Sequence, residues 1–182
     1  MTENILSSLK HIKTFVFDVD GVLTDGSVQL LPSGDQVRTM NTRDGYALQL
    51  AVKKGYTVAI ITGGRSEAVR SRMKGLGITD VYLGATDKRD ALEELLLIHD
   101  RKAENTLYMG DDLPDYEVMQ KVGLPCCPSD AAREIKEIAA YISPIAGGAG
   151  CVRDIIERTL RLQGNWFEPE NDSHHLAEPS EK

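Results

Sequence analysis

The sequence has few cysteines. There are three in 182 residues, an odd number. Adjacent Cys126 and Cys127 match neither a disulfide framework nor zinc-finger spacing, and no histidine lies near them. We therefore expect these two and Cys151 to be small buried side chains rather than redox or metal-binding groups.

Positive charge and long hydrophobic runs are also scarce. The formal net charge is -7, which disfavours a phosphate backbone as a partner, so we predict no nucleic-acid binding. A small anionic substrate could still be bound by a few local cations. No apolar run reaches the roughly 18 residues of a membrane helix, and the N-terminal MTENILSSLKHIK lacks the apolar core of a secretory signal. The sequence therefore predicts a cytoplasmic protein without membrane association.

Short β-rich runs alternate with longer helical patterns, which is typical of a parallel sheet flanked by helices. We expect an α/β fold, a three-layer Rossmann-like arrangement, in one domain spanning residues 1–166, followed by a flexible polar tail at 167–182. The expected strands are TFVF, TVAIIT, DVYLG, NTLYMG, LPCC and AYIS, and the expected helices are 44–54, 66–76, 88–99, 114–122, 130–139 and 150–163.

One segment interrupts the alternation. GSVQLLPSGDQVRTMN, residues 26–41, has two β-like arms around a Pro-Ser-Gly-Asp turn and predicts a projecting β-hairpin. After it, no insertion is large enough for a second domain covering the sheet edge.

Aspartates gather where two of the expected strands end. FVFDVDGVLTD places Asp18 and Asp20 after the first strand, and YMGDDLPD places Asp111, Asp112 and Asp115 after the fourth. Singly, each could be a helix N-cap or a turn residue. Because ligands of open parallel sheets bind beyond the carboxyl ends of the strands, the two clusters should converge and bind a cation, for which Mg²⁺ is the best match to oxygen ligands.

Two further segments supply groups for an anion. ITGGRS places Thr62 and Gly63 after the second strand, where a hydroxyl and backbone N–H groups can bind phosphate oxygens. GATDKRDAL places Lys88 at a helix start, where its ammonium group can neutralise negative charge.

This order of motifs resembles the haloacid dehalogenase superfamily from about Thr14 to Asp115. The resemblance implies that Asp18 is a nucleophile that forms an aspartyl-phosphate and that Asp20 is the general acid/base, with Thr62 and Lys88 assisting. It also implies Mg²⁺ bound by the Asp18 carboxylate, the Asp20 backbone carbonyl and Asp111, with Asp112 and Asp115 in support. Since superfamily ATPases carry Thr at the position of Asp20 and dehalogenases lack an Asp there, a phosphatase is favoured over a phosphomutase.

The longer pattern FDVDGVLTDG, NTRDGYAL, AIITGG, YMGDDLPD, VMQKVGL and IAGGAGCVRDIIE resembles the cap-less 3-deoxy-D-manno-octulosonate 8-phosphate phosphatases. That resemblance implies a phosphorylated acidic keto-sugar as substrate, a role in lipopolysaccharide biosynthesis, and a homotetramer in which the hairpin closes a neighbour's site. Where the family usually has ITGR, this chain has ITGGR. The implied substrate-binding residues are Asn41, Thr42, Arg43, Asp44, Gly45, Gly63, Arg65 and Arg72.

Three alternatives stay open from the sequence. A phosphatase of nonulosonate 9-phosphates would have the same architecture. A catalytically silent assembly module should have lost the aspartate pair. A phosphoacceptor receiver domain, the non-enzyme alternative, would carry its acceptor on the third strand, where DVYLG has no aspartate at its end.

Overall fold

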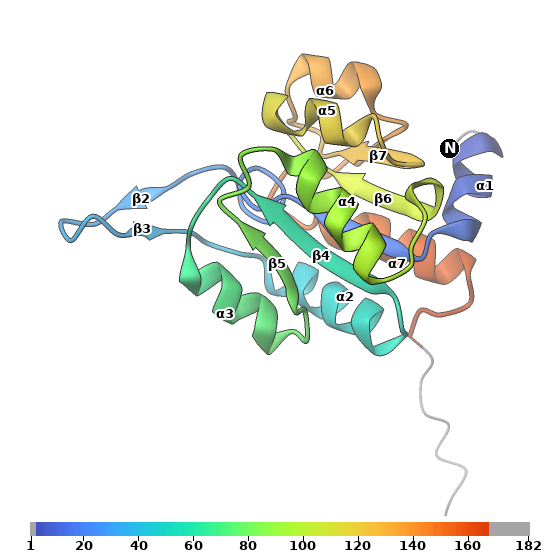
Figure 1. Cartoon of the computed structure of the whole chain (residues 1–182), viewed down its shortest axis with the longest axis horizontal. Helices are drawn as coiled ribbons and strands as arrows, with labels where there is room; N and C mark the ends of the chain where they lie inside the picture. The colour runs from blue at the N-terminus through green and yellow to red at the C-terminus, as the bar shows by residue number, and fades with distance from the viewer. Residues whose placement is uncertain (1–2, 168–182) are drawn as a thin grey trace, which may run out of the picture.

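The computed structural model describes residues 3–167, which contain a six-stranded parallel sheet with the strand order β5-β4-β1-β6-β7-β8 (Figure 1). The strands are β1 Thr14–Phe17, β4 Thr57–Thr62, β5 Asp80–Leu83, β6 Thr106–Met109, β7 Leu124–Cys127 and β8 Tyr141–Ile142. β1 lies at the centre and pairs with β4 and β6, which brings three sequence-distant strand ends to one edge. The predicted fold class is confirmed.

Helices cover both faces of the sheet. Phe15 and Phe17 of β1 belong to one core cluster, together with apolar side chains of α1 Glu3–His11, α2 Thr42–Lys53, α3 Glu67–Gly75 and α7 Cys151–Leu162. Val16 faces the second cluster, with side chains of α4 Lys88–Ile98, α5 Tyr116–Met119 and α6 Arg133–Ile138. Since successive strand residues point to opposite faces, both sides of β1 are buried, as its unbroken apolar run requires.

The predicted elements match the observed ones with four main differences. The sequence analysis missed α1, in which Leu9 is buried, as is Ile12 directly after the helix. The segment predicted as a helix at 114–122 is a 3₁₀ turn, η2 Leu113–Asp115, followed by the short α5, because the Asp115 side chain turns inward to bond Tyr108 and Lys88. The helix predicted at 130–139 is shortened to α6. A second 3₁₀ turn, η1 Ala103–Asn105, precedes β6.

Several other predictions concern the cysteines, membrane spans and the domain boundary. The three cysteines are free and buried, as expected. Among residues 3–167, no helix is long and apolar enough to cross a membrane. The predicted domain boundary at 166 stays a prediction, and the tail predicted at 167–182 lies outside the described residues except for Phe167.

The predicted hairpin forms and projects away from the sheet on the left of Figure 1. β2 Gln29–Leu30 and β3 Gln36–Val37 pair antiparallel in a sheet of their own. Its turn is closed by bonds from Leu31 N to the Asp35 carbonyl and from Gly34 N to the Leu31 carbonyl. Leu30 is 74% exposed and Val37 is 41% exposed, so this single chain leaves apolar side chains of the hairpin in water.

Candidate active site

The carboxylate of Asp18 lies at the centre of the strand-end edge. Its backbone N–H donates to the Met109 carbonyl at 3.1 Å, which continues the pairing of β1 with β6. One carboxylate oxygen accepts a bond from Val19 N at 2.7 Å, and the other lies 2.8 Å from Nζ of Lys88. Asp18 is therefore held in one orientation by its own turn and by the first residue of α4.

Asp115 holds Lys88 from the other side. Its Oδ1 accepts bonds from Lys88 Nζ at 2.6 Å and from the Tyr108 hydroxyl at 2.8 Å, and its Oδ2 accepts one from Asp111 N at 3.2 Å. Lys88 and Asp115 are both buried. This network fixes the ammonium group between two carboxylates, so that Asp115 positions Lys88 rather than facing solvent.

Burial and mutual repulsion perturb these groups. Burial raises the pKa of Asp18 to about 6, with a further contribution from Asp115, while Lys88 opposes the shift. Burial and the neighbouring carboxylates raise the pKa of Asp111 to about 7. Burial alone would lower the pKa of Lys88, but Asp18 and Asp115 raise it above the ordinary value. The cluster therefore contains more negative charge than its one lysine compensates.

The carboxylates fit a divalent cation. Oxygen atoms of Asp18, Asp111 and Asp115 lie within 4.8 Å of one another. The Asp111 carboxyl occupies the space where a Cβ at Gly21 would lie, and Gly21 has φ +83°, so this turn accepts only glycine. Because Asp115 already receives three protein hydrogen bonds, Asp18 and Asp111 are the groups free to bind Mg²⁺, which prefers oxygen ligands and bound water. Asp112 is exposed, and its carbonyl accepts from Asp115 N.

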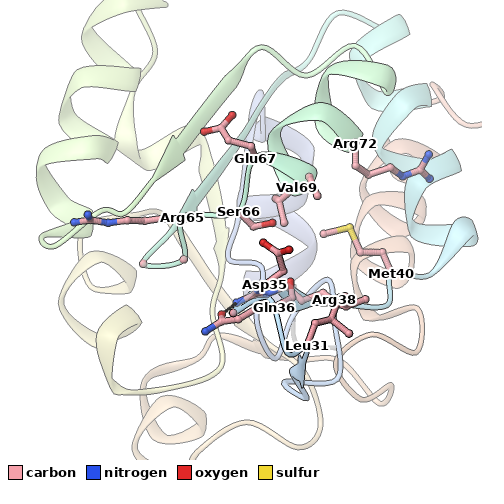
Figure 2. A pocket seen from close by; sticks show the side chains of 15 residues that line it. Leu31, Asp35, Gln36, Arg38, Met40, Arg65, Ser66, Glu67, Val69 and Arg72 are labelled. Atoms are coloured by element: carbon pink, nitrogen blue, oxygen red, sulfur yellow. Dashed lines mark hydrogen bonds between the residues drawn. The ribbon is translucent and has the colours of Figure 1, made fainter.

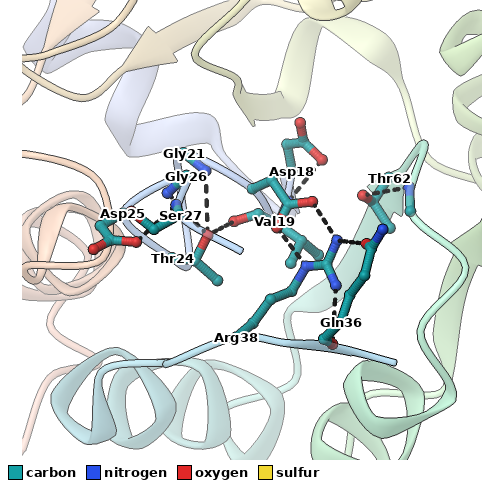
Figure 3. Close-up of polar contacts among 12 residues, drawn as sticks. Asp18, Val19, Gly21, Thr24, Asp25, Gly26, Ser27, Gln36, Arg38 and Thr62 are labelled. Atoms are coloured by element: carbon teal, nitrogen blue, oxygen red, sulfur yellow. Dashed lines mark hydrogen bonds and ion pairs between the residues drawn. The ribbon is translucent and has the colours of Figure 1, made fainter. Parts of the chain in front are cut away.

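Asp20 forms an ion pair with Arg38, an arginine that follows the second arm of the hairpin. Figure 3 shows Arg38 with its neighbours Gln36 and Thr62. Arg38 donates from Nε to Oδ1 at 2.6 Å and from Nη2 to Oδ2 at 3.0 Å. Thr62, buried at the end of β4, accepts a bond from Gly64 N at 3.2 Å. A Cβ at Gly64 would lie 3.5 Å from the Thr62 hydroxyl and 3.8 Å from an Asp20 oxygen, so these groups share one small region.

Sequence reasoning missed Arg38. It is 18 residues from Asp20 and belongs to the exposed hairpin. The hairpin pattern predicts two arms and a turn, but it carries no signal for the direction in which the arms lean. The one indication in the sequence is that Arg38 directly follows the second arm, at the end of the hairpin that leads back to the sheet.

A cavity of about 1060 Å³ lies between the hairpin and the start of α3 (Figure 2). Gly63, Arg65 and Arg72, all predicted to bind substrate, line it together with Arg38. Arg72 lies over Gly45, where a Cβ would come within 2.6 Å of its Nη2. Arg65 extends away from the hairpin side chains in Figure 2, and a Cβ at Gly84 would lie 2.9 Å from its Nε.

The other predicted substrate residues have local structural contacts. Asn41 caps α2 by accepting from Arg43 N, and it donates to the Gly148 carbonyl. Asp44 is buried and accepts from Arg153 N at 2.7 Å, and burial raises its pKa to about 6. Thr42 is exposed at the start of α2. Arg43 lines a second cavity, of about 560 Å³. Within one chain, Arg43 and Arg72 therefore line different cavities, and the substrate roles of these residues stay predictions.

Comparison with known proteins gives consistent matches. The haloacid dehalogenase-like hydrolase family matches residues 75–152. The chain is 37% identical over 173 residues to the 3-deoxy-D-manno-octulosonate 8-phosphate phosphatase of Escherichia coli K12, covering 95% of this chain and 92% of that one. The crystal structure of the phosphatase from Yersinia pestis superposes with a TM-score of 0.88 at 35% identity, covering 91% of this chain and 89% of the other.

One further structure contains ligands. It is the 3-deoxy-D-manno-octulosonate 8-phosphate phosphatase from Moraxella catarrhalis in complex with magnesium ion, phosphate ion and KDO. It superposes with a TM-score of 0.87 at 34% identity, covering 91% of this chain and 95% of the other. These similarities extend over nearly the whole of both chains.

Proposed function

Because the chain belongs to the 3-deoxy-D-manno-octulosonate 8-phosphate phosphatases of the haloacid dehalogenase-like hydrolases, we propose that it hydrolyses this sugar phosphate at the Asp18 site. The observation that supports the proposal is the pairing of the buried carboxylate of Asp18 with the buried ammonium group of Lys88 at 2.8 Å. Asp18 stands two residues before Asp20 in the sequence. Asp20 lies in the turn that follows β1, and its carboxylate shares a small region with the Thr62 hydroxyl, next to the end of the strand that leads to Asp18.

In the first step, an Asp18 carboxylate oxygen attacks the phosphorus. The bond between phosphorus and the sugar oxygen breaks, and Asp20 gives its proton to that leaving oxygen. The Thr62 hydroxyl and the Lys88 ammonium bind the transferring phosphoryl group and stabilise its negative charge. Mg²⁺, when bound by Asp18, the Asp20 carbonyl and Asp111, supplies additional positive charge at the same place.

In the second step, the Asp20 carboxylate accepts a proton from water, and the resulting hydroxyl oxygen attacks the phosphorus. The bond to Asp18 breaks, which regenerates its carboxylate and releases inorganic phosphate. Asp20 is again protonated and ready for the next cycle. Its partial exposure, with 34% of the side chain accessible, gives water a route to the phosphorus.

The substrate specificity is assigned to the cavity next to Asp20. Gly63, Arg65 and Arg72 line it, and the two arginines can pair with the sugar carboxylate. Asn41, Thr42, Arg43, Asp44 and Gly45 do not line this cavity within one chain, and we propose that they assist in binding the sugar. The test is to measure kcat/KM for a panel of phosphorylated eight- and nine-carbon keto-acids. The 8-phosphate of 3-deoxy-D-manno-octulosonate should give the highest value, and a preference for a nine-carbon sugar would assign the alternative substrate.

Removal of the metal should abolish turnover. Chelation by EDTA leaves Asp18 and Asp111 with more negative charge than Lys88 compensates, and added Mg²⁺ should restore full activity. Ca²⁺ should inhibit, because its larger and looser coordination shell misplaces the nucleophile relative to the phosphorus. The measurement is steady-state hydrolysis after exhaustive dialysis against chelator, and full activity at that stage would contradict the metal assignment.

We further propose a cytoplasmic homotetramer in which the hairpin closes a neighbour's site. The support is the exposed apolar surface of the hairpin, for which Leu30 and Val37 are the main contributors. The double variant Leu30→Glu/Val37→Glu should give a smaller assembly that still hydrolyses p-nitrophenyl phosphate but loses roughly tenfold or more in kcat/KM for the sugar phosphate. Light scattering and kinetics measure the two effects.

A matched control separates assembly from a general effect of added charge. Leu97 is 83% exposed near the end of α4, away from the hairpin, so Leu97→Glu should change neither the assembly nor the kinetics. A wild-type protein that is monomeric at micromolar concentration would refute the tetramer. Unchanged kcat/KM in the double variant would refute the role of the hairpin.

A further inference from the structure

The hairpin holds the side chain of Asp20 from outside the sheet. Both Asp20 oxygens accept from the Arg38 guanidinium, at 2.6 Å and 3.0 Å, in a bidentate arrangement (Figure 3). The Arg38 side chain is only 9% exposed although its hairpin is exposed. A fork of this kind fixes orientation as well as charge, because two parallel N–H···O bonds define the plane of the carboxylate.

Arg38 is itself tied to the hairpin. Its Nη2 donates to Oε1 of Gln36 at 3.1 Å, and its Nη1 donates to the Gln36 carbonyl at 3.4 Å. Gln36 belongs to β3, so the guanidinium is connected to the second arm of the hairpin by side-chain and backbone contacts. A displacement of that arm would therefore displace the partner of Asp20.

Both steps of hydrolysis need Asp20 at the same place, because water attacks in line, opposite the bond from Asp18 to phosphorus, where the sugar oxygen has just departed. It must reach the leaving oxygen and then the attacking water. In both steps Arg38 pairs with the ionised carboxylate of Asp20. In the first step this carboxylate is left after Asp20 gives its proton to the leaving oxygen, and in the second step it accepts a proton from water. A guanidinium that pairs with this form stabilises it and limits the orientations that it adopts.

We propose that Arg38 is a positioning residue for Asp20, through which the placement of the hairpin controls general acid–base catalysis. This inference rests on the proposed function, in which Asp20 is the acid and base. Arg38 acts on the reaction through Asp20, and it is not required for the attack by Asp18, whose partners are Val19 and Lys88.

The test separates the two half-reactions. With p-nitrophenyl phosphate the leaving group departs without protonation, so formation of the phosphoenzyme needs no general acid, whereas its breakdown needs the base. In rapid-mixing experiments Arg38→Gln should release the first equivalent of p-nitrophenolate at the wild-type rate. The following steady-state rate should be roughly 10- to 100-fold lower, with acid-stable phosphoenzyme accumulating.

The conservative variant and the substrate series sharpen the result. Arg38→Lys keeps the charge but not the fork, and it should recover part of the steady-state rate. Across phosphate esters of increasing leaving-group basicity, the loss in kcat caused by Arg38→Gln should grow. Arg133→Gln, which makes the same chemical change at an exposed arginine of α6, is the control and should behave as wild type, because Arg133 pairs only locally with Glu137.

Different outcomes would overturn the inference in different ways. A slower first turnover would mean that Arg38 supports the whole site. A rise in KM for the sugar phosphate with kcat unchanged would make it a substrate ligand of the cavity that it lines. If Asp20→Asn stalls turnover but Arg38→Gln matches wild type, only this inference fails, whereas full turnover by Asp20→Asn refutes the proposed role of Asp20 itself.

Discussion

Asp18→Asn is expected to lower phosphatase turnover by roughly 10³-fold or more, the size of loss typical of a missing covalent nucleophile. The amide has nearly the shape of the carboxylate and can keep the bond from Val19 N, but its oxygen is a poor nucleophile and it carries no charge for the metal. Steady-state hydrolysis of the sugar phosphate and of p-nitrophenyl phosphate measures the effect, and no phosphoenzyme should form with either substrate.

The stability of the variant provides the folding control. Burial opposes ionisation of Asp18, which is why its pKa rises to about 6. A neutral amide at this position should therefore leave the melting temperature at neutral pH no lower than that of wild type. Asp25→Asn, in an exposed turn of the same loop, makes the same chemical change outside the cluster and should keep full activity. Hydrolysis near the wild-type rate by folded Asp18→Asn would contradict the assignment.

The sequence predicts this site well because topology brings the motifs together. The aspartates after β1 and β6 and the lysine at the start of α4 are separated by up to about a hundred residues. Since parallel neighbouring strands end at the same edge, their position after a strand was enough to predict their convergence. The structure places Lys88 between Asp18 and Asp115, whereas the sequence indicated only that its ammonium group could neutralise negative charge at the start of a helix.

The sequence predicts contacts poorly where tertiary packing decides them. Asp44 reads as a polar residue next to Arg43, yet it is buried because it accepts a bond from Arg153, 109 residues away. α1 has only nine residues, and an isolated helix of that length is marginal in water, so Leu9 and the following Ile12 are ordered by packing against the core. Both features depend on residues that are distant in sequence.

Lys88→Met is the second variant for which a large effect is expected. The substitution keeps much of the side-chain volume but removes the ammonium group, whose Nζ lies 2.8 Å from an Asp18 oxygen and 2.6 Å from an Asp115 oxygen. The transferring phosphoryl group loses a fixed cation, and kcat should fall by roughly 10²- to 10³-fold, as when other preorganised charge-stabilising donors are removed. Steady-state kinetics at saturating Mg²⁺ measures this loss.

The stability of the same variant should depend on pH more strongly than that of the wild type, because the carboxylates of the cluster repel one another. In the folded wild type the pKa values of Asp18 and Asp111 are raised, to about 6 and about 7, above the ordinary value of 3.8. The folded state therefore binds more protons than the unfolded state between about pH 4 and pH 7, and this difference lowers stability as pH rises through that window.

Without Lys88 the upward shifts in the pKa values of Asp18 and Asp111 should be larger. The melting temperatures of the variant and the wild type should then be close at pH 5 and diverge by pH 8. The expected difference in the free energy of unfolding at pH 8 is about 3–5 kcal/mol, the usual cost of breaking a buried ion pair. Lys102→Met, which removes an exposed lysine, is the control and should show no such divergence. A Lys88→Met protein with wild-type kcat, or with a melting difference that does not change with pH, would show that Lys88 does not compensate the carboxylates.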